Sequence, residues 1–148
     1  MVLIRKYNSS DLEAVTDLMA DLGYPTDVDS MKQRMKLIEN NPGYFTFVAI
    51  QDHEVVGMIG TRLVHYYEGD GVTVQISIVV VREDLQGMGI GKELLGFIEN
   101  WAKEKGANSL YLTSGIKPER MKAHEFYKKN GFDINGYRFV KRFEMVHI

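Results

Sequence analysis

The sequence predicts a single-domain α/β fold, built on a mixed β-sheet with helices on both of its faces. Its 148 residues are the length of one domain that can bury a sizeable core. Segments with apolar residues every three or four positions alternate along the chain with β-branched runs and with runs of alternating polarity. A hydrophobic content of 45% and a charged content of 26% are ordinary for a soluble globular protein. These features favour one α/β domain over residues 1–148.

The first half of the chain predicts two short helices between a first strand and a three-stranded meander. Val2–Lys6 alternates in polarity as a strand does, and the polar residues from Asn8 to Asp11 supply the N-cap of a helix that Gly23 ends. A second helix follows and stops at Asn41. Short polar turns then join three strands, which must therefore be antiparallel. These strands are Tyr44–Ile50, Val55–Tyr66 and Val72–Val81.

The second half predicts a crossover helix, a parallel strand, a further helix and a closing hairpin. The crossover helix is amphipathic and ends at Gly106. Because a helix joins Val72–Val81 to Ala107–Leu112, these two strands are expected to be parallel. The next helix is Glu119–Lys129, and the complete order is β-α-α-β-β-β-α-β-α-β-β. The closing hairpin consists of Phe132–Ile134, a turn at Asn135 and Gly136, and Tyr137–Met145.

Composition excludes several classes of function. The chain has no cysteine, which rules out disulfides, thiolate metal sites and a cysteine nucleophile. No apolar run is long enough to span a bilayer, and the N-terminus has no secretory segment. The formal net charge of -2 argues against a general nucleic-acid binder. A cytoplasmic location is expected. No metal is expected either, since the histidines lack metal-ligand spacing: His53, His65, His124 and His147.

Charges are unevenly distributed along the chain. Acidic residues occur between Tyr7 and Met31 without any lysine or arginine, whereas basic residues predominate from Lys117 onward. Solvated helix faces and sheet edges explain this pattern. An acidic end that attracts a cationic substrate, together with a basic end that faces an anionic cofactor, is the alternative explanation.

A glycine-rich loop, QGMGIG from Gln86 to Gly91, follows the strand Val72–Val81 and opens the next helix. Backbone N–H groups in such a turn come close to a ligand and point the same way as the positive end of the helix, which suits a phosphate. Glycine-rich turns also occur for packing reasons. A nucleoside-triphosphate loop is excluded because Glu93 stands where Ser or Thr is required. The GxGxG spacing also fits a dinucleotide fingerprint poorly.

The later helix carries a second motif, AHEFYKKNGF, from Ala123 to Phe132. It resembles the closing motif of the GNAT family of N-acetyltransferases, in which Ala, Phe-Tyr and then Gly-Phe follow the strand beyond the pyrophosphate loop. QGMGIG resembles that family's Gln/Arg-x-x-Gly-x-Gly/Ala signature at Gln86, Gly89 and Gly91. Both motifs occur in the family's order with a strand between them. The order of elements is also similar to the family's over nearly the whole chain.

The resemblance implies that acetyl-CoA lies at a splay between the fourth and fifth strands. Backbone groups of Val79, Val80 and Val81 would pair with the pantetheine arm. The charges of Lys92 and Arg120 are candidates for contact with the phosphates. Tyr127 matches the family's tyrosine that protonates the departing thiolate, so it is the candidate general acid. The amides expected to hold the pyrophosphate are those of Gln86, Gly87, Met88, Gly89, Ile90 and Gly91.

This sequence departs from the family pattern at the general base. Many relatives carry a glutamate on the strand before the glycine loop, where QISIVVV offers only Gln75 and Ser77. Deprotonation of the acceptor is then left to water held by such groups, to bulk solvent or to a residue elsewhere, with His65 and Glu68 as candidates. His124 matches a variant of the family motif, which implies packing or a cofactor-side role.

The resemblance therefore implies an acetyl-CoA-dependent N-acetyltransferase that acts on a primary amine of a small molecule or a peptide. The acidic first helices favour a cationic acceptor, such as a polyamine, an aminoglycoside, or a lysine or N-terminal amine of a peptide. A homodimer is a further expectation by resemblance. The missing strand glutamate keeps one alternative of another class open, an acyl-CoA-binding sensor or interaction module with little catalysis.

Overall fold

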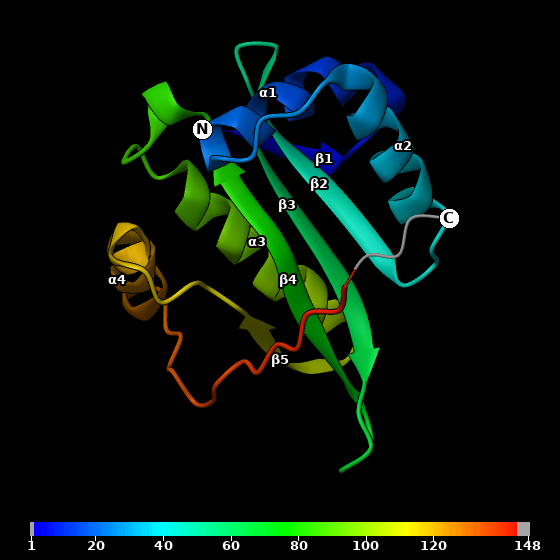
Figure 1. Ribbon diagram of the computed structural model, residues 1–148, viewed down its shortest axis with the longest axis vertical. Coiled ribbons are helices and arrows are strands. Elements are labelled where there is room, and N and C mark those ends of the chain that lie inside the picture. Colours follow the sequence, from blue (N-terminus) through cyan, green and yellow to red (C-terminus); the bar gives the residue numbers. More distant parts are fainter. Residues whose placement is uncertain (1, 145–148) are drawn as a thin grey trace. The chain divides into compact units, whose positions relative to one another are not determined.

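The computed structural model describes residues 2–144. The chain forms two compact units, Met1–Leu112 and Thr113–Ile148. The first unit contains the β-sheet and helices α1 to α3, and the second contains helix α4 (Figure 1). The mixed α/β fold class predicted from the sequence is confirmed. A single domain over residues 1–148 stays a prediction.

The sheet of the first unit has the strand order β1-β2-β3-β4-β5. The first four strands are antiparallel neighbours, and β5 is parallel to β4, as the sequence predicts. Asp52 and His53, with φ values of 52° and 65°, form the turn between β2 and β3, so His53 is a turn residue. The strands are β1 (Leu3–Lys6), β2 (Tyr44–Gln51), β3 (Glu54–His65), β4 (Val72–Val81) and β5 (Ala107–Leu112).

Helices α1 (Leu12–Leu22) and α2 (Val28–Glu39) cover one face of the sheet. Asp27 caps α2 by accepting a hydrogen bond of 2.7 Å from the N–H of Ser30. Gly23, in the left-handed region, ends α1 as expected. The core under these helices combines apolar residues of both helices with residues of β2, β3 and β4: Val15, Leu18, Met31, Val48, Met58 and Val80.

Helix α3 (Ile90–Glu104) covers the opposite face of the sheet (Figure 1). The Phe97 ring of this helix packs edge-on against Phe47 of β2, with the ring centroids 5.0 Å apart. The ring centroids of Trp101 and of Phe45 on the same strand are 4.9 Å apart. Its apolar stripe is fully buried at Leu94 and Ile98. The helices therefore sandwich the sheet as the sequence predicts.

A partly buried ion pair fixes the chain where β1 leads into α1. Asp11, only 4% exposed, accepts hydrogen bonds of 2.8 and 2.9 Å from the Arg5 guanidinium and one of 2.9 Å from the N–H of Asn8. The hydrogen bond from Arg5 is the main reason that the pKa of Asp11 lies below its ordinary value, since desolvation acts the other way. The carboxylate therefore stabilises the folded protein in its charged form.

Replacing Asp11 by alanine is expected to lower the free energy of unfolding at pH 7 by about 2 kcal/mol, because it leaves the Arg5 charge and the Asn8 N–H without their partner. A carboxylate with a lowered folded pKa contributes fully above its ordinary value of 3.8, and this stability is lost as the pH falls through the lowered pKa. Urea unfolding at pH 7 and at acidic pH measures this. A wild-type advantage that persists unchanged in strong acid contradicts the assignment.

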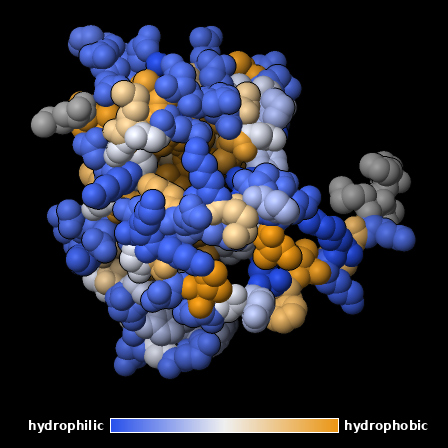
Figure 2. Space-filling view, turned by 90° about the vertical axis from the view of Figure 1, so that its left-hand side faces the viewer, coloured by the Kyte–Doolittle hydropathy of each residue, from blue (hydrophilic) through white to orange (hydrophobic). Residues whose placement is uncertain are grey.

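The second unit contains α4 (Met121–Lys129), preceded by a 3₁₀ turn at Pro118–Arg120. The sequence predicted two closing strands, Phe132–Ile134 and Tyr137–Met145, and this prediction was wrong. Residues 132–144 form no strand, and Met145 lies outside the described residues. An alternating pattern forms a strand only where a neighbouring edge completes its hydrogen bonds. Here Tyr137 is 90% exposed and Phe139 is 93% exposed. The face of the molecule drawn in Figure 2 has hydrophobic patches among hydrophilic ones.

Candidate active site

The two parallel strands β4 and β5 are paired only over the first half of β4. The last register pair is Ile76 with Leu112, while β4 continues to Val81 (Figure 1). Residues 77–81 of β4 therefore present an edge that β5 does not cover, and such an edge offers backbone N–H and C=O groups to an extended ligand. The predicted splay between the fourth and fifth strands is present, and it contains Val79, Val80 and Val81.

A β-bulge occurs where β4 leaves β5. Thr61 of β3 pairs with Ile76 and Gly60 pairs with Ile78, so Ser77 is the extra residue on β4. A bulge of this kind bends its strand and locally interrupts the ladder. Ser77 is exposed at this position. The vertex of the splay is therefore marked by both the end of the β4–β5 ladder and a bend in β4.

The segment between β4 and the glycine loop is held firmly in place. The N–H of Arg82 donates to the carbonyl of Val56 at 2.8 Å, and its guanidinium pairs with Asp84 at 2.7 Å and with Glu54 at 3.0 Å. These hydrogen bonds raise the pKa of Arg82 and lower that of Asp84. A surface hollow of about 500 Å³ lies here, between Arg82, its acidic neighbours and Asp21 of α1.

The glycine loop has the geometry that anion binding requires. Gly87 and Gly89 have φ values of 83° and 89°, and a Cβ built on either would meet nothing within 4 Å. Both glycines thus stand in open space in a conformation that disfavours other residues. The first hydrogen bond within α3 runs from the N–H of Glu93 to the carbonyl of Gly89, so the N–H groups of residues 90–92 have no acceptor within the helix. These amides are available to a phosphate.

The structure brings together the first group of predicted site residues. Val79 to Val81, the loop from Gln86 to Gly91 and the exposed Lys92 in the first turn of α3 follow one another in the first unit. Met88 is 70% exposed at the tip of the loop. Gln86 reaches back toward β4, with its side-chain amide 3.4 Å from the carbonyl of Val81. The predicted site residues of the first unit are thus continuous from the part of β4 that β5 does not cover to the N-terminus of α3.

Arg120 and Tyr127 belong to the second unit, at the 3₁₀ turn and on α4. The ring of Tyr127 packs between those of Phe126, at 5.5 Å, and Phe132, at 5.8 Å. Burial raises the pKa of the Tyr127 phenol, and the positive charge of Arg120 partly opposes that shift. The phenol therefore holds its proton at neutral pH. The roles of Tyr127 and Arg120 stay predictions.

Two of the candidates for the missing base lie near the start of β4. His65 is exposed at the end of β3 and pairs with Val72, and Glu68 lies in the following turn. Along an extended strand Val72 is about 16 Å from Ser77, far beyond hydrogen-bonding reach. His124 has a local role in the second unit, where its Nε2 donates to the carbonyl of Gly115 at 2.7 Å. His147 lies outside the described residues.

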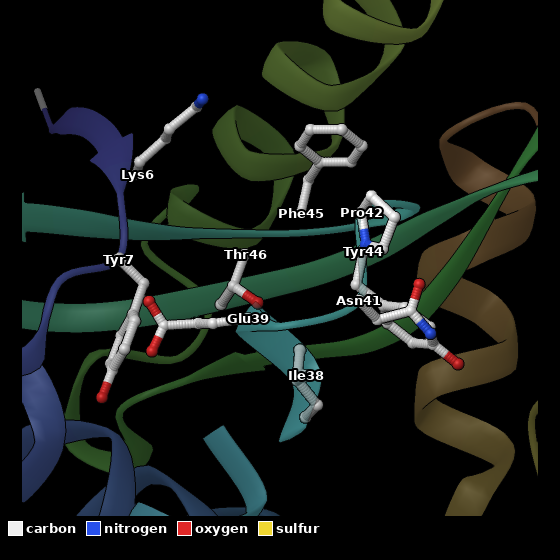
Figure 3. A pocket seen from close by; sticks show the side chains of 9 residues that line it. All are labelled: Lys6, Tyr7, Ile38, Glu39, Asn41, Pro42, Tyr44, Phe45 and Thr46. Carbon is white, nitrogen blue, oxygen red and sulfur yellow. The ribbon is translucent and has the colours of Figure 1, made fainter. Parts of the chain in front are cut away.

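Two features of the first unit were missed by sequence reasoning. Arg62 of β3 donates through its Nε to the side-chain oxygen of Gln75, which the sequence offered as a possible water-holding residue. The second feature is a hollow of about 320 Å³ beside β1 and β2, where the Glu39 carboxylate lies near the Tyr7 phenol and Tyr44 lies farther along the wall (Figure 3). Burial, followed by the charges of Glu39 and Asp11, raises the pKa of Tyr7. Both features depend on strand pairing, which periodicity does not reveal.

No group of three or more histidine, aspartate or glutamate residues between positions 2 and 144 is arranged to hold a metal ion. None of the helices formed in this part of the chain combines the length and the apolar character needed to cross a membrane.

Known proteins resemble this chain over nearly its whole length. The model of the acetyltransferase (GNAT) family matches residues 12–132. An aminoalkylphosphonate N-acetyltransferase of Salmonella typhimurium is 29% identical over 140 residues, covering 93% of this chain and 89% of that protein. A crystal structure of a GNAT family acetyltransferase from Staphylococcus aureus is 28% identical, with a TM-score of 0.83 over 96% of this chain and 98% of that chain. An aminoglycoside N-acetyltransferase in complex with CoA, 19% identical, shares the fold with a TM-score of 0.83 over 98% of this chain and 96% of that one.

Proposed function

Because this chain belongs to the acetyltransferase (GNAT) family and is an acetyl-CoA-dependent N-acetyltransferase, we propose that it acetylates a primary amine of a small molecule or peptide by direct attack, with Tyr127 as general acid. The observation that carries this proposal is the uncovered edge of β4 leading into the glycine loop at the N-terminus of α3. That arrangement offers a strand-like partner to an extended arm and amides to a diphosphate, one directly after the other.

Under this proposal, acetyl-CoA lies along the first unit and runs from the glycine loop to the bulge in β4. Its pyrophosphate binds the amides from Gln86 to Gly91, where the open space beside Gly87 and Gly89 admits it. The side chains of Lys92 and Arg120 place positive charges near these phosphates. The pantetheine arm then pairs with Val81, Val80 and Val79. The thioester consequently ends near the bulge at Ser77, at the vertex of the splay.

The reaction needs no enzyme nucleophile, in keeping with a chain that has no cysteine. The amine nitrogen attacks the thioester carbonyl, a C–N bond forms, and the C–S bond breaks. The departing sulfur takes the proton of the Tyr127 phenol, whose raised pKa keeps that proton in place until the transfer. The proton lost by the amine leaves to water, since the Gln75 side-chain oxygen accepts a hydrogen bond from Arg62 and no carboxylate occupies this part of β4. The Tyr127 phenolate then takes a proton from water, which restores the phenol.

The acceptor is a small molecule or a peptide amine. Similar proteins include an aminoalkylphosphonate N-acetyltransferase and an aminoglycoside N(6')-acetyltransferase, both named for small amines. These similarities support a small acceptor over a protein. A cytoplasmic location and a homodimer are retained as expectations from the sequence.

Adding CoA is expected to raise the melting temperature of the protein, because a ligand that binds only the folded state stabilises it by about 2.7 kcal/mol at one hundred times its dissociation constant. Thiol release from acetyl-CoA in the presence of a panel of primary amines then measures turnover. A melting temperature that CoA leaves unchanged contradicts cofactor binding at the splay.

The alternative of an acyl-CoA sensor with little catalysis is favoured by one observation, the absence of a carboxylate from β4. The two functions differ in one outcome of the same assay. A sensor gains thermal stability from CoA and releases no thiol with any amine, whereas an acetyltransferase does both.

A further inference from the structure

A row of side chains crosses the first unit's sheet at the vertex of the splay. Tyr44 pairs with Arg62, Arg62 with Gln75, and Gln75 with Tyr111, so the four residues lie side by side on β2, β3, β4 and β5. Directly paired residues point to the same face of a sheet. The adjacent pair of Phe45 and Thr61 faces α3, where Phe45 contacts Trp101, so the row faces the side opposite α3.

The half-buried Arg62 has no counter-ion within the first unit. Its Nε donates to Gln75, while the two terminal nitrogens make no hydrogen bond to any residue described between positions 2 and 112. No carboxylate in that range lies within 4 Å of its guanidinium. A half-buried guanidinium in this state favours an anion, and its planar fork matches an anion with two oxygens. Gln75 fixes the orientation of that fork.

The position of this row relative to the reacting carbonyl limits the size of the ligand. Gln75 and Ile76 form the last pairs between β4 and β5, and Gln75 precedes the bulge at Ser77 by about 7 Å of strand. Arg62 stands one strand further, about 5 Å to the side. An anion on Arg62 is thus within a few atoms of an amine that attacks a thioester near Ser77.

Three acidic residues at the start of the chain have partners within the first unit. Asp11 is paired with Arg5, Asp27 caps α2 through Ser30, and Asp21 accepts a hydrogen bond of 3.3 Å from the N–H of Glu83. These carboxylates therefore have structural partners. The expectation of a cationic substrate, drawn from the number of acidic residues in the sequence, stays a prediction.

We propose that Arg62, oriented by Gln75, binds the anionic group of the acceptor, so that the substrate is a small amine carrying a carboxylate, phosphonate or phosphate. This proposal rests on the acetyl transfer proposed above and specifies its acceptor. Tyr44 and Tyr111, at the two ends of the row, flank the ligand with aromatic surface. Arg62 is a binding residue here and takes no part in proton transfer.

Matched pairs of amines test the proposal with the full-length protein. O-phosphoethanolamine is compared with ethanolamine, and β-alanine with β-alaninamide, by thiol release from acetyl-CoA. The wild type is expected to favour the anionic member of at least one pair at least tenfold in kcat/KM, and the pair that responds distinguishes phosphate from carboxylate. In Arg62→Gln this ratio falls toward one, mainly through KM, and in Arg62→Lys part of it is retained.

Arg34→Gln is the control, since it removes the same charge from an exposed position on α2. Its ratio should equal that of the wild type. The CoA-dependent rise in melting temperature shows that each variant is folded, and Arg62→Lys serves if Arg62→Gln is not. Turnover without preference for the anionic amine, or a preference that survives Arg62→Gln, overturns this proposal alone. No thiol release with any amine overturns the acetyl transfer and this proposal with it.

Discussion

Replacing Gly89 by aspartate is expected to weaken CoA binding by about 100-fold or more. Gly89 has a φ of 89° at the position just before α3, and the space where its Cβ would lie is open. Aspartate is among the few residues that tolerate this backbone conformation, so the fold is retained. Its carboxylate, however, is placed where the pyrophosphate binds, and like charges brought together there cost several kcal/mol. Calorimetric titration with CoA measures the loss.

Two matched variants separate charge from backbone effects. Gly89→Asn introduces a side chain of nearly the same size without charge, and it should weaken binding much less than Gly89→Asp. Gly106→Asp places the same residue on a glycine with a similar φ of 81° and open surroundings, but beyond the other end of α3. It should bind CoA as the wild type does. Equal affinity of Gly89→Asp and wild type would remove the glycine loop from the cofactor site.

Tyr127→Phe is expected to lower kcat by about 100-fold while CoA affinity changes little. General acid catalysis contributes about 10²- to 10⁴-fold, and this substitution removes only the hydroxyl that supplies the proton. The aromatic packing with Phe126 and Phe132 is preserved, so α4 should stay intact. Steady-state thiol release gives kcat, and calorimetry gives the affinity for CoA.

Tyr137→Phe provides the control for this second variant. It also removes one phenolic hydroxyl from the second unit, at a side chain that is 90% exposed. Its kcat should equal that of the wild type. If Tyr127→Phe loses CoA affinity more than turnover, the phenol acts in binding and the departing thiolate takes its proton from another donor.

Local signals were sufficient for most of the fold. Gly23 ends α1, the turn at Asp52 and His53 joins β2 to β3, and the glycines before Ile90 open α3, as expected from the sequence. Each of these features depends on residues that are adjacent in the chain or one helical turn apart. The parallel pairing of β4 with β5 also followed, because a helical crossover permits little else.

Those local signals could not predict how distant segments of the chain pair. The alternation after Phe132 predicted two strands that the second unit does not form, since alternation does not supply a neighbouring edge. The same limit concealed Arg62, whose significance comes only from lying opposite Gln75 at the end of the β4–β5 ladder. In the sequence, it is one arginine among many.

The sequence by itself determined the fold class, the order of elements through α4 and the two motifs by which the family was identified, because helix caps, turn residues and glycine positions are encoded locally. Only the tertiary structure decided where β4 leaves β5, which strand edge stays open and which cation lies beside the vertex of the splay. These depend on strand register, which is set by the packing of segments that are far apart in the chain.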